Sequence, residues 1–207
     1  MNNGRFITIE GIDGAGKSCN LVWIKSLLEN AGKTVVCTRE PGGTLLGEEI
    51  RNLLLQHRVG GMEVVTELLL LCAARAEHIA TKIRPSLARG EWVLCDRFSD
   101  ATYAYQGGGR GLNNAIIATA ESVFENNLQP DLTFLFDVSV EISKARVQHR
   151  SASDRFDQET TAFFQRVRDA YLQRAANFPH RIRVIDANGK LMQVQQEILK
   201  QINDYLQ

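Results

Sequence analysis

The chain has 207 residues, of which 44% are hydrophobic and 23% are charged, and this composition predicts one folded domain over residues 1–207 rather than a disordered, collagen-like or coiled-coil protein. The chain has 24 basic residues (lysine and arginine) and 24 acidic residues (aspartate and glutamate). This balance leaves no broad positive field for a nucleic acid polymer or an anionic membrane. We find no membrane-length apolar run, no secretory signal and no closely spaced cysteine pair, and we therefore expect a cytoplasmic protein with reduced thiols.

Short apolar runs rich in β-branched residues alternate along the chain with longer amphipathic stretches. The short runs predict buried strands at residues 6–10, 34–38, 92–96, 132–138 and 182–186. The amphipathic stretches predict helices at residues 21–29, 62–88, 115–126, 140–149, 157–178 and 191–206. This alternation predicts an α/β fold, with a five-stranded, mostly parallel sheet covered by helices on both faces. Ligands bind beyond the carboxyl ends of such strands.

A glycine-rich motif follows the first predicted strand directly. Residues 11–18 read GIDGAGKS, a complete G-x-x-x-x-G-K-[ST] pattern between a strand and a helix. We expect the phosphates of a nucleotide to be bound by Gly11, Ile12, Asp13, Gly14, Ala15, Gly16, Lys17 and Ser18. Lys17 would reach the β- and γ-phosphates, and the Ser18 hydroxyl suits Mg²⁺. A switch GTPase is disfavoured because the chain has no N-K-x-D guanine signature.

An arginine stands at the end of the second predicted strand, in Arg39-Glu40-Pro41-Gly42-Gly43. Proline and glycine favour a tight turn there, from which Arg39 could bind a phosphate monoester. The alternative is a local ion pair of Arg39 with Glu40 or Glu48.

The third predicted strand ends in Asp96-Arg97-Phe98. Asp96 suits a water-mediated contact with Mg²⁺, and Arg97 supplies a second cation for the transferred phosphate. Alternatively, Asp96 and Arg97 pair with each other. The glycine run 107–109 predicts a segment deformable enough to close over a ligand.

A short polar segment with three arginines, residues 146–156, lies between two predicted helices. Phosphoryl transfer depends on positioning and charge neutralisation, so we expect this segment to act as a lid that brings arginines to the phosphates. The alternative is a solvated basic loop.

Taken in order, these motifs resemble those of the thymidylate kinases. The resemblance rests on residues 11–18, TREPGGT (38–44), AARAEH (73–78), DRFSDATYAYQGGGR (96–110), PDLT (130–133) and DRF (154–156). It implies a P-loop kinase fold and transfer of the γ-phosphate of ATP to dTMP, giving dTDP and ADP for dTTP biosynthesis. It also implies Mg²⁺ as cofactor and a homodimer, for which the long predicted helix 62–88 offers an interface.

The resemblance also implies roles for single residues in binding dTMP. Arg39 and Arg97 would hold its phosphate, with Asp13 near the sugar and the phosphates. The remaining contacts would come from Arg75 and Gln106 at the thymine edge, Thr102 near the imide and Tyr105 under the deoxyribose. Arg75 and His78 could instead be surface residues of a helix, and Tyr105 could be part of the core.

Catalytic roles follow from the same resemblance. Gly14 within the phosphate loop resembles the bacterial type, whose catalytic arginines lie in the lid, and this favours Arg150 and Arg155. We therefore expect catalysis by Lys17, Arg97, Arg150, Arg155 and Asp13, with Ser18 and Asp96 at the metal. The acceptor phosphate is already ionised at neutral pH, so transfer needs no strong general base.

One departure from the family pattern concerns the base pocket. Leu71 and Cys72 stand where the family usually has an aromatic ring that stacks on thymine. Phe98 or Tyr103 could supply a ring instead, and replacing either Leu71 or Cys72 by phenylalanine should tighten dTMP binding.

The departure keeps open another nucleoside monophosphate kinase, acting on UMP, CMP or AMP. A second alternative is a nucleotide-binding regulator without turnover. Arg75 and Gln106 favour thymine, and the intact Lys17 and Asp96 favour a working enzyme.

Overall fold

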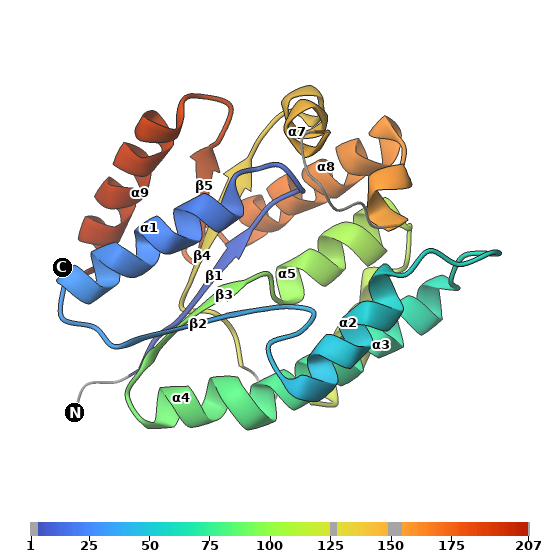
Figure 1. Cartoon of the computed structure of the whole chain (residues 1–207), viewed down its shortest axis with the longest axis horizontal. Coiled ribbons are helices and arrows are strands. Elements are labelled where there is room, and N and C mark those ends of the chain that lie inside the picture. The colour runs from blue at the N-terminus through green and yellow to red at the C-terminus, as the bar shows by residue number, and fades with distance from the viewer. Residues whose placement is uncertain (1–3, 125–127, 149–154, 207) are drawn as a thin grey trace.

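A computed structural model of the chain describes residues 4–124, 128–148 and 155–206. Parallel strands form one five-stranded sheet in the order β2-β3-β1-β4-β5 (Figure 1). They are β1 (Phe6–Glu10), β2 (Val35–Arg39), β3 (Trp92–Asp96), β4 (Leu132–Asp137) and β5 (Ile182–Asp186). The five predicted strands are confirmed, with β2 shifted by one residue and β4 shorter by one. All residues of β1 are buried, as expected for a central strand covered on both faces.

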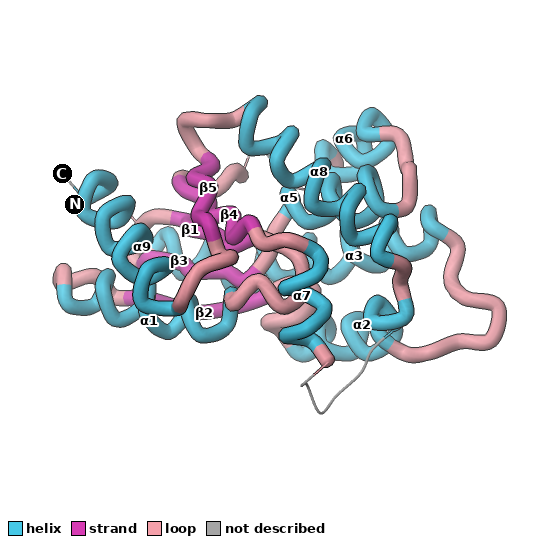
Figure 2. Tube along the Cα trace, turned by 90° about the horizontal axis from the view of Figure 1, so that it is seen from above, coloured by secondary structure: helices cyan, strands magenta, loops and turns pink. Residues whose placement is uncertain are grey.

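Helices surround the sheet. They are α1 (Lys17–Asn30), α2 (Leu45–Leu55), α3 (Val64–His78), α4 (Arg84–Ala88), α5 (Ser99–Thr102), α6 (Asn114–Ser122), α7 (Val140–Val147), α8 (Thr161–Asn177) and α9 (Leu191–Leu206). Helices α1 and α9 pack together on one face of the sheet, while α4 contacts β3 and α8 contacts β4 and β5 (Figure 1). The view from above shows α2, α3 and α6 grouped beside the strands, away from α1 and α9 (Figure 2). None of the described helices combines the length and apolarity that a bilayer crossing requires.

The helix predicted over residues 62–88 is observed from Val64 to Ala88, as a continuous helical stretch in which a π-helical turn, Ile79–Ile83, joins α3 to α4. The sequence patterns did not predict α2, which begins after Thr44, whose hydroxyl accepts a hydrogen bond from the Gly47 N–H at 2.9 Å.

The expectation of a deformable glycine segment is wrong. Residues Tyr103–Gly109 form a π-helical segment that packs closely against α8. A Cβ atom at Gly108 would lie 2.5 Å from the Ala170 Cβ, and one at Gly109 would lie 2.6 Å from the Phe163 ring. These glycines therefore allow close helix packing.

The register of the sheet brings two predicted motifs together. Ile9 of β1 pairs with Asp96 of β3, so the residues that follow both strands leave the sheet side by side. The phosphate loop and the Asp96-Arg97 pair consequently meet at the carboxyl edge of the sheet.

Candidate active site

The phosphate loop joins β1 to α1 through backbone conformations that need glycine. Gly11, Gly14 and Gly16 have φ values of 137°, 76° and 86°. A Cβ atom at Gly14 would lie 2.5 Å from the Ser143 carbonyl oxygen of α7, so any larger residue there would push the loop from its place. The loop thus has the curled shape in which N–H groups can surround a phosphate.

Lys17 closes this loop from within. Its Nζ donates hydrogen bonds to the carbonyl oxygens of Gly11 and Ile12, both at 3.0 Å, and lies 3.9 Å from Asp13 Oδ1. Burial lowers the pKa of Lys17 to about 8, and the positive charge of Arg97 acts in the same direction. An anionic phosphate in the loop would reverse this shift, because it favours the charged ammonium.

Arg97 lies between the phosphate loop and the residues of the third motif. Its Nη1 donates to the Gly11 carbonyl oxygen at 3.0 Å, and its Nη2 donates to Asp13 Oδ1 at 2.7 Å. The same two nitrogens donate to the hydroxyls of Tyr171 and Tyr105 at 3.2 and 3.1 Å. The backbone of Arg97 has φ of 70°, a left-handed conformation that is unusual for a residue with a side chain. This strained position aims the guanidinium at the phosphate loop.

Glu10, which the sequence patterns did not indicate, binds two neighbours of Arg97. Its carboxylate accepts hydrogen bonds from the Phe98 N–H and the Tyr171 hydroxyl, both at 2.7 Å. Burial raises the pKa of Glu10 to about 8, helped by the negative charge of Asp100 and opposed by Arg97. Glu10 thereby fixes both neighbours on which the Arg97 side chain and backbone depend.

The residues predicted to hold a metal fit one. Asp96 Oδ1 is buried and, within the described part of the chain, accepts no hydrogen bond, which leaves a carboxylate oxygen for a water or cation. Ser18 is exposed at the start of α1, beside the same loop. Among the described residues, no group of three or more histidine, cysteine, aspartate or glutamate side chains could hold a metal. One carboxylate, from Asp96, and one hydroxyl, from Ser18, suit Mg²⁺, which binds few protein ligands together with phosphates and water.

A cavity opens beside Arg97 and joins most of the predicted substrate residues. It is lined by Asp13, Glu40, Pro41, Arg51, Leu54, Leu55, Glu67, Leu71, Arg75, Arg97, Phe98, Ala101, Thr102, Tyr105, Gln106 and Phe156. Its lining includes Asp13 and Arg97, which contact each other at the phosphate loop, together with Leu71 and Gln106. The cavity therefore offers charged groups for a phosphate and apolar and amide groups for a base.

Arg39 does not line this cavity, and its alternative assignment is confirmed. Its Nη2 donates to Glu48 Oε2 at 2.8 Å in an exposed ion pair. Arg51 of α2 lines the cavity instead and donates to the Pro41 carbonyl oxygen at 3.0 Å. The sequence signal for Arg51 is the amphipathic pattern over residues 45–55, which would have placed it on a helix directly after the Pro-Gly turn.

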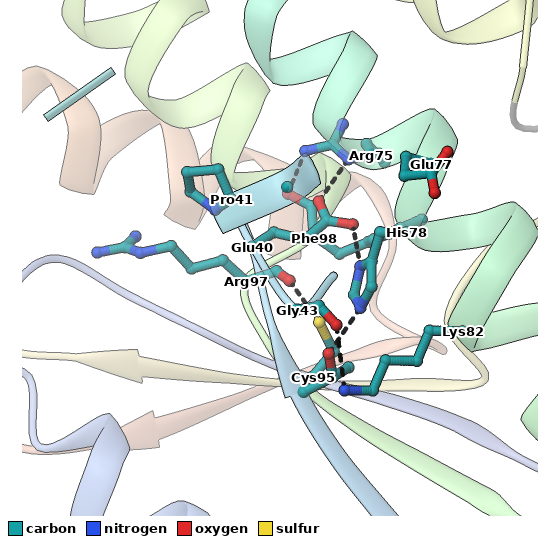
Figure 3. A network of polar contacts seen from close by, with 12 residues as sticks. Glu40, Pro41, Gly43, Arg75, Glu77, His78, Lys82, Cys95, Arg97 and Phe98 are labelled. Carbon is teal, nitrogen blue, oxygen red and sulfur yellow. Dashed lines mark hydrogen bonds and ion pairs between the residues drawn. The ribbon is translucent and has the colours of Figure 1, made fainter. Parts of the chain in front are cut away.

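Arg75 and His78 belong to a buried network rather than to the protein surface (Figure 3). Both side chains point from α3 toward Glu40, which accepts from Arg75 Nε at 2.6 Å and contacts His78 Nδ1 at 2.9 Å. The Nε2 of His78 contacts the Thr38 hydroxyl at 2.6 Å. The surface alternative for both residues is wrong, since they are only 3% and 0% exposed.

The remaining donors of Arg75 bind the third motif. Its Nη2 donates to the Phe98 carbonyl oxygen at 3.1 Å and to the Thr102 hydroxyl at 2.9 Å, and its Nη1 donates to Glu121 at 3.2 Å. Arg75 thus joins β2, α3, α5 and α6 while still lining the cavity.

Tyr105 and Gln106 both face the cavity from the π-helical segment. The Tyr105 ring also packs edge-on against Phe156, Phe163 and Tyr171, so its core role and its cavity position coexist. Gln106 is 2% exposed, and its Nε2 donates to Glu67 Oε1 at 2.5 Å.

Leu71 and Cys72 differ in position. Leu71 lines the cavity, whereas Cys72 is buried in a hydrophobic cluster with Leu68 and Ile117. Tyr103 packs on that same cluster, and Phe98 contributes to the cavity wall. Of the two rings considered as substitutes, Phe98 is therefore the one that borders the cavity.

The lid arginines are placed only in part, because Arg150 lies outside the described residues. Arg155 contacts two residues that line the cavity: its Nη2 is 2.6 Å from Glu67 Oε2, and its Nε donates to the Leu54 carbonyl oxygen. Arg146, at the end of α7, donates to the Gly14 carbonyl oxygen at 3.2 Å and to the Ala187 carbonyl oxygen at 3.1 Å. Arg146 is thus the arginine of the predicted lid segment that touches the phosphate loop within the described residues.

Comparison with known proteins agrees with this geometry. The family model described as thymidylate kinase matches residues 9–198. The chain is 55% identical over 202 residues to the thymidylate kinase of Alcanivorax borkumensis, covering 98% of this chain and 97% of that protein. It is 50% identical over 205 residues to the thymidylate kinase of Nitrosomonas europaea, covering 99% and 95%. The crystal structure of thymidylate kinase from Ehrlichia chaffeensis superposes with a TM-score of 0.76 at 36% identity, covering 99% of both chains.

Proposed function

The chain belongs to the thymidylate kinase family, with its P-loop kinase fold, and from this premise we propose how its residues carry out the reaction. It is an ATP-dependent phosphotransferase that converts dTMP and ATP to dTDP and ADP in dTTP biosynthesis. Family membership favours this reaction over a UMP or CMP kinase and over a regulator without turnover.

The observation that carries the proposed mechanism is the position of Arg97. Its guanidinium bonds to the phosphate loop through Gly11 and Asp13 and also lines the cavity. A cation at this junction can contact the dTMP phosphate and the γ-phosphate of ATP together. The dTMP oxygen would attack the γ-phosphorus in line, while Lys17 and Arg97 neutralise the charge that spreads over the transferred group.

For the metal, we propose that Ser18 and Asp96 hold Mg²⁺, Ser18 directly and Asp96 through water. The unpartnered Asp96 Oδ1 supports this assignment. When bound there, Mg²⁺ would supply positive charge that neutralises the phosphates of ATP.

For dTMP binding, we propose that Tyr105 lies under the deoxyribose, and that Arg75, Thr102 and Gln106 surround the thymine edge. Their common cavity supports this arrangement. We propose that Arg39 and Arg97 bind the dTMP phosphate, and Arg51 is a further cation on the cavity wall.

For the lid, we propose that Arg150 and Arg155 contribute charge when the segment closes. Arg155 would first have to leave Glu67 and the Leu54 carbonyl oxygen, which it contacts in this structure.

We also propose a homodimer through α3. Val65 and Leu69 of α3 are 51% and 58% exposed, and Ile116 of the neighbouring α6 is 47% exposed. Apolar side chains grouped on adjacent helices are typical of a surface buried by association.

A cytoplasmic location is supported by the four cysteines, all of which are free thiols.

The reaction is tested by ADP release from Mg·ATP in parallel reactions with dTMP, dUMP, UMP, CMP or AMP. We expect the highest kcat/KM with dTMP and a loss of about 10²–10³-fold in kcat for Arg97→Met. Preference for another monophosphate, or no ADP release with any acceptor, would contradict the proposed function.

Light scattering of wild type and Leu69→Glu tests the dimer, which the introduced charge should dissociate.

A further inference from the structure

We propose that Glu67 determines base specificity by fixing which end of the Gln106 amide faces the cavity. The inference rests on the proposed function and adds to it a positioning residue that the sequence motifs did not indicate. Glu67 lies on α3 and is 1% exposed, yet it lines the same cavity as Gln106.

The direction of the amide follows from the chemistry of its partner. A carboxylate only accepts hydrogen bonds, whereas the two ends of an amide differ, one donating and the other accepting. Gln106 Nε2 lies 2.5 Å from Glu67 Oε1, so the nitrogen must face Glu67. With the nitrogen turned to Glu67, the oxygen is the amide end left to accept from a ligand in the cavity that Gln106 lines.

Glu67 is itself held by two arginines. Arg155 Nη2 lies 2.6 Å from Oε2, and Arg110 Nε lies 3.6 Å from Oε1. Arg110 in turn pairs with Glu159. Because these ion pairs are partly or fully shielded from water, they keep the carboxylate in one place, and the orientation of the Gln106 amide is preset before a nucleotide binds.

A preset acceptor selects for one class of pyrimidine. Thymine and uracil carry an N3–H donor between two carbonyl groups, whereas cytosine carries an unprotonated N3 that only accepts. The Gln106 oxygen can accept from the N3–H of a keto pyrimidine but would face the lone pair of cytosine. Buried polar groups that are left unpaired discriminate strongly between ligands of equal size.

The test is the kcat/KM of wild type and Glu67→Gln with dTMP, dUMP and dCMP. A glutamine at position 67 can donate or accept, so the Gln106 amide can turn and offer its nitrogen to cytosine. We expect the dTMP to dCMP ratio of kcat/KM to fall by about tenfold or more. The dTMP to dUMP ratio should stay within about twofold, because both bases carry N3–H. A wild type that does not phosphorylate dTMP would instead refute the proposed function.

The matched control is Glu159→Gln, which changes the same ion network at Arg110 without touching Gln106. Its dTMP to dCMP ratio should equal that of wild type. The double variant Glu67→Gln/Arg155→Gln removes the charge that the single variant leaves unpaired, and it serves if the single variant does not fold. Because Arg155 is also proposed to act in the lid, the double variant is judged only by its dTMP to dCMP ratio, which should fall as in Glu67→Gln. A dTMP to dCMP ratio equal to that of wild type would overturn the proposal and leave Glu67 a structural role only.

Discussion

The phosphate loop and the base pocket adjoin each other at Arg97, but they are built in different ways. The loop is eight consecutive residues whose backbone shape depends on three glycines with positive φ. The pocket is assembled from α2, α3, α5 and the π-helical segment after it, and buried ion pairs of Arg75 join α3 to Glu40 after β2 and to Glu121 of α6. A continuous motif thus makes the donor side, and side chains distant in sequence make the acceptor side.

This difference predicts different responses to mutation. Removing a side chain from the loop takes away a contact with phosphate but leaves the backbone cradle in place. Removing a charge from the pocket leaves other buried charges without partners, so the structure itself should weaken. The following predictions test this contrast.

The largest expected effect is the loss of stability in Arg75→Met. The substitution leaves Glu40 and Glu121 in the interior without their guanidinium, and breaking a buried ion pair from one side costs about 3–5 kcal/mol. Urea unfolding of the nucleotide-free protein measures the change.

The control for Arg75 is Arg39→Met, which breaks the exposed pair with Glu48. Exposed pairs contribute about 0–1 kcal/mol, so this variant should unfold like wild type. If both variants lose equal stability, the pocket is not held by its buried charges.

Next in size is the loss of activity in Lys17→Met. Without the ammonium that faces the transferred phosphate, kcat should fall by about 10²–10³-fold. Its unfolding free energy should equal or exceed that of wild type, because Lys17 is a buried cation whose pKa burial has lowered. Lys25→Met, on the exposed face of α1, should keep both activity and stability. A large stability loss in Lys17→Met would remove the contrast with Arg75.

A smaller effect is expected from pH on ATP binding. The pKa of Lys17 without nucleotide is about 8, and bound phosphates must raise it, so binding above pH 8 requires proton uptake. ATP affinity should therefore fall by about tenfold between pH 7 and pH 9 as the free lysine loses its charge. Isothermal titration calorimetry in two buffers of different ionisation enthalpy measures affinity and proton uptake together. An equal pH slope in Lys17→Met would assign the effect to another group.

The contrast between the two regions also explains what the sequence could predict. The strands and the phosphate loop could be predicted because each is encoded in a short continuous segment, the strands by apolar runs and the loop by its glycine motif. Arg97 contacts the phosphate loop, as expected for a residue that follows a parallel strand of the same sheet, and its role in catalysis stays a prediction.

Arg39 pairs with Glu48, as the alternative from sequence had it, and its contact with the dTMP phosphate stays a prediction. The residues that the sequence patterns missed have partners far apart in the chain. Glu67 and Glu10 carry no motif of their own, and their roles depend on Gln106 and Tyr171, which fold against them from 39 and 161 residues away. The glycine run at 107–109 was predicted to be deformable, but α8 packs too closely on Gly108 and Gly109 for a side chain, and α8 lies far along the chain.

The smallest predicted effect concerns the missing aromatic ring, and here the structure sharpens the expectation from sequence. Leu71 borders the cavity, so Leu71→Phe should lower the KM for dTMP by about threefold, recovering part of the roughly 1–3 kcal/mol that a stacked ring supplies. Steady-state kinetics at saturating ATP give this KM, and kcat should not change. Cys72→Phe is the comparison, because Cys72 packs against Leu68 and Ile117 in a separate cluster. A larger ring there overfills the core and should lower stability without lowering KM. If Cys72→Phe tightened dTMP binding and Leu71→Phe did not, the base would have to stack elsewhere than the end of the cavity that carries Leu71.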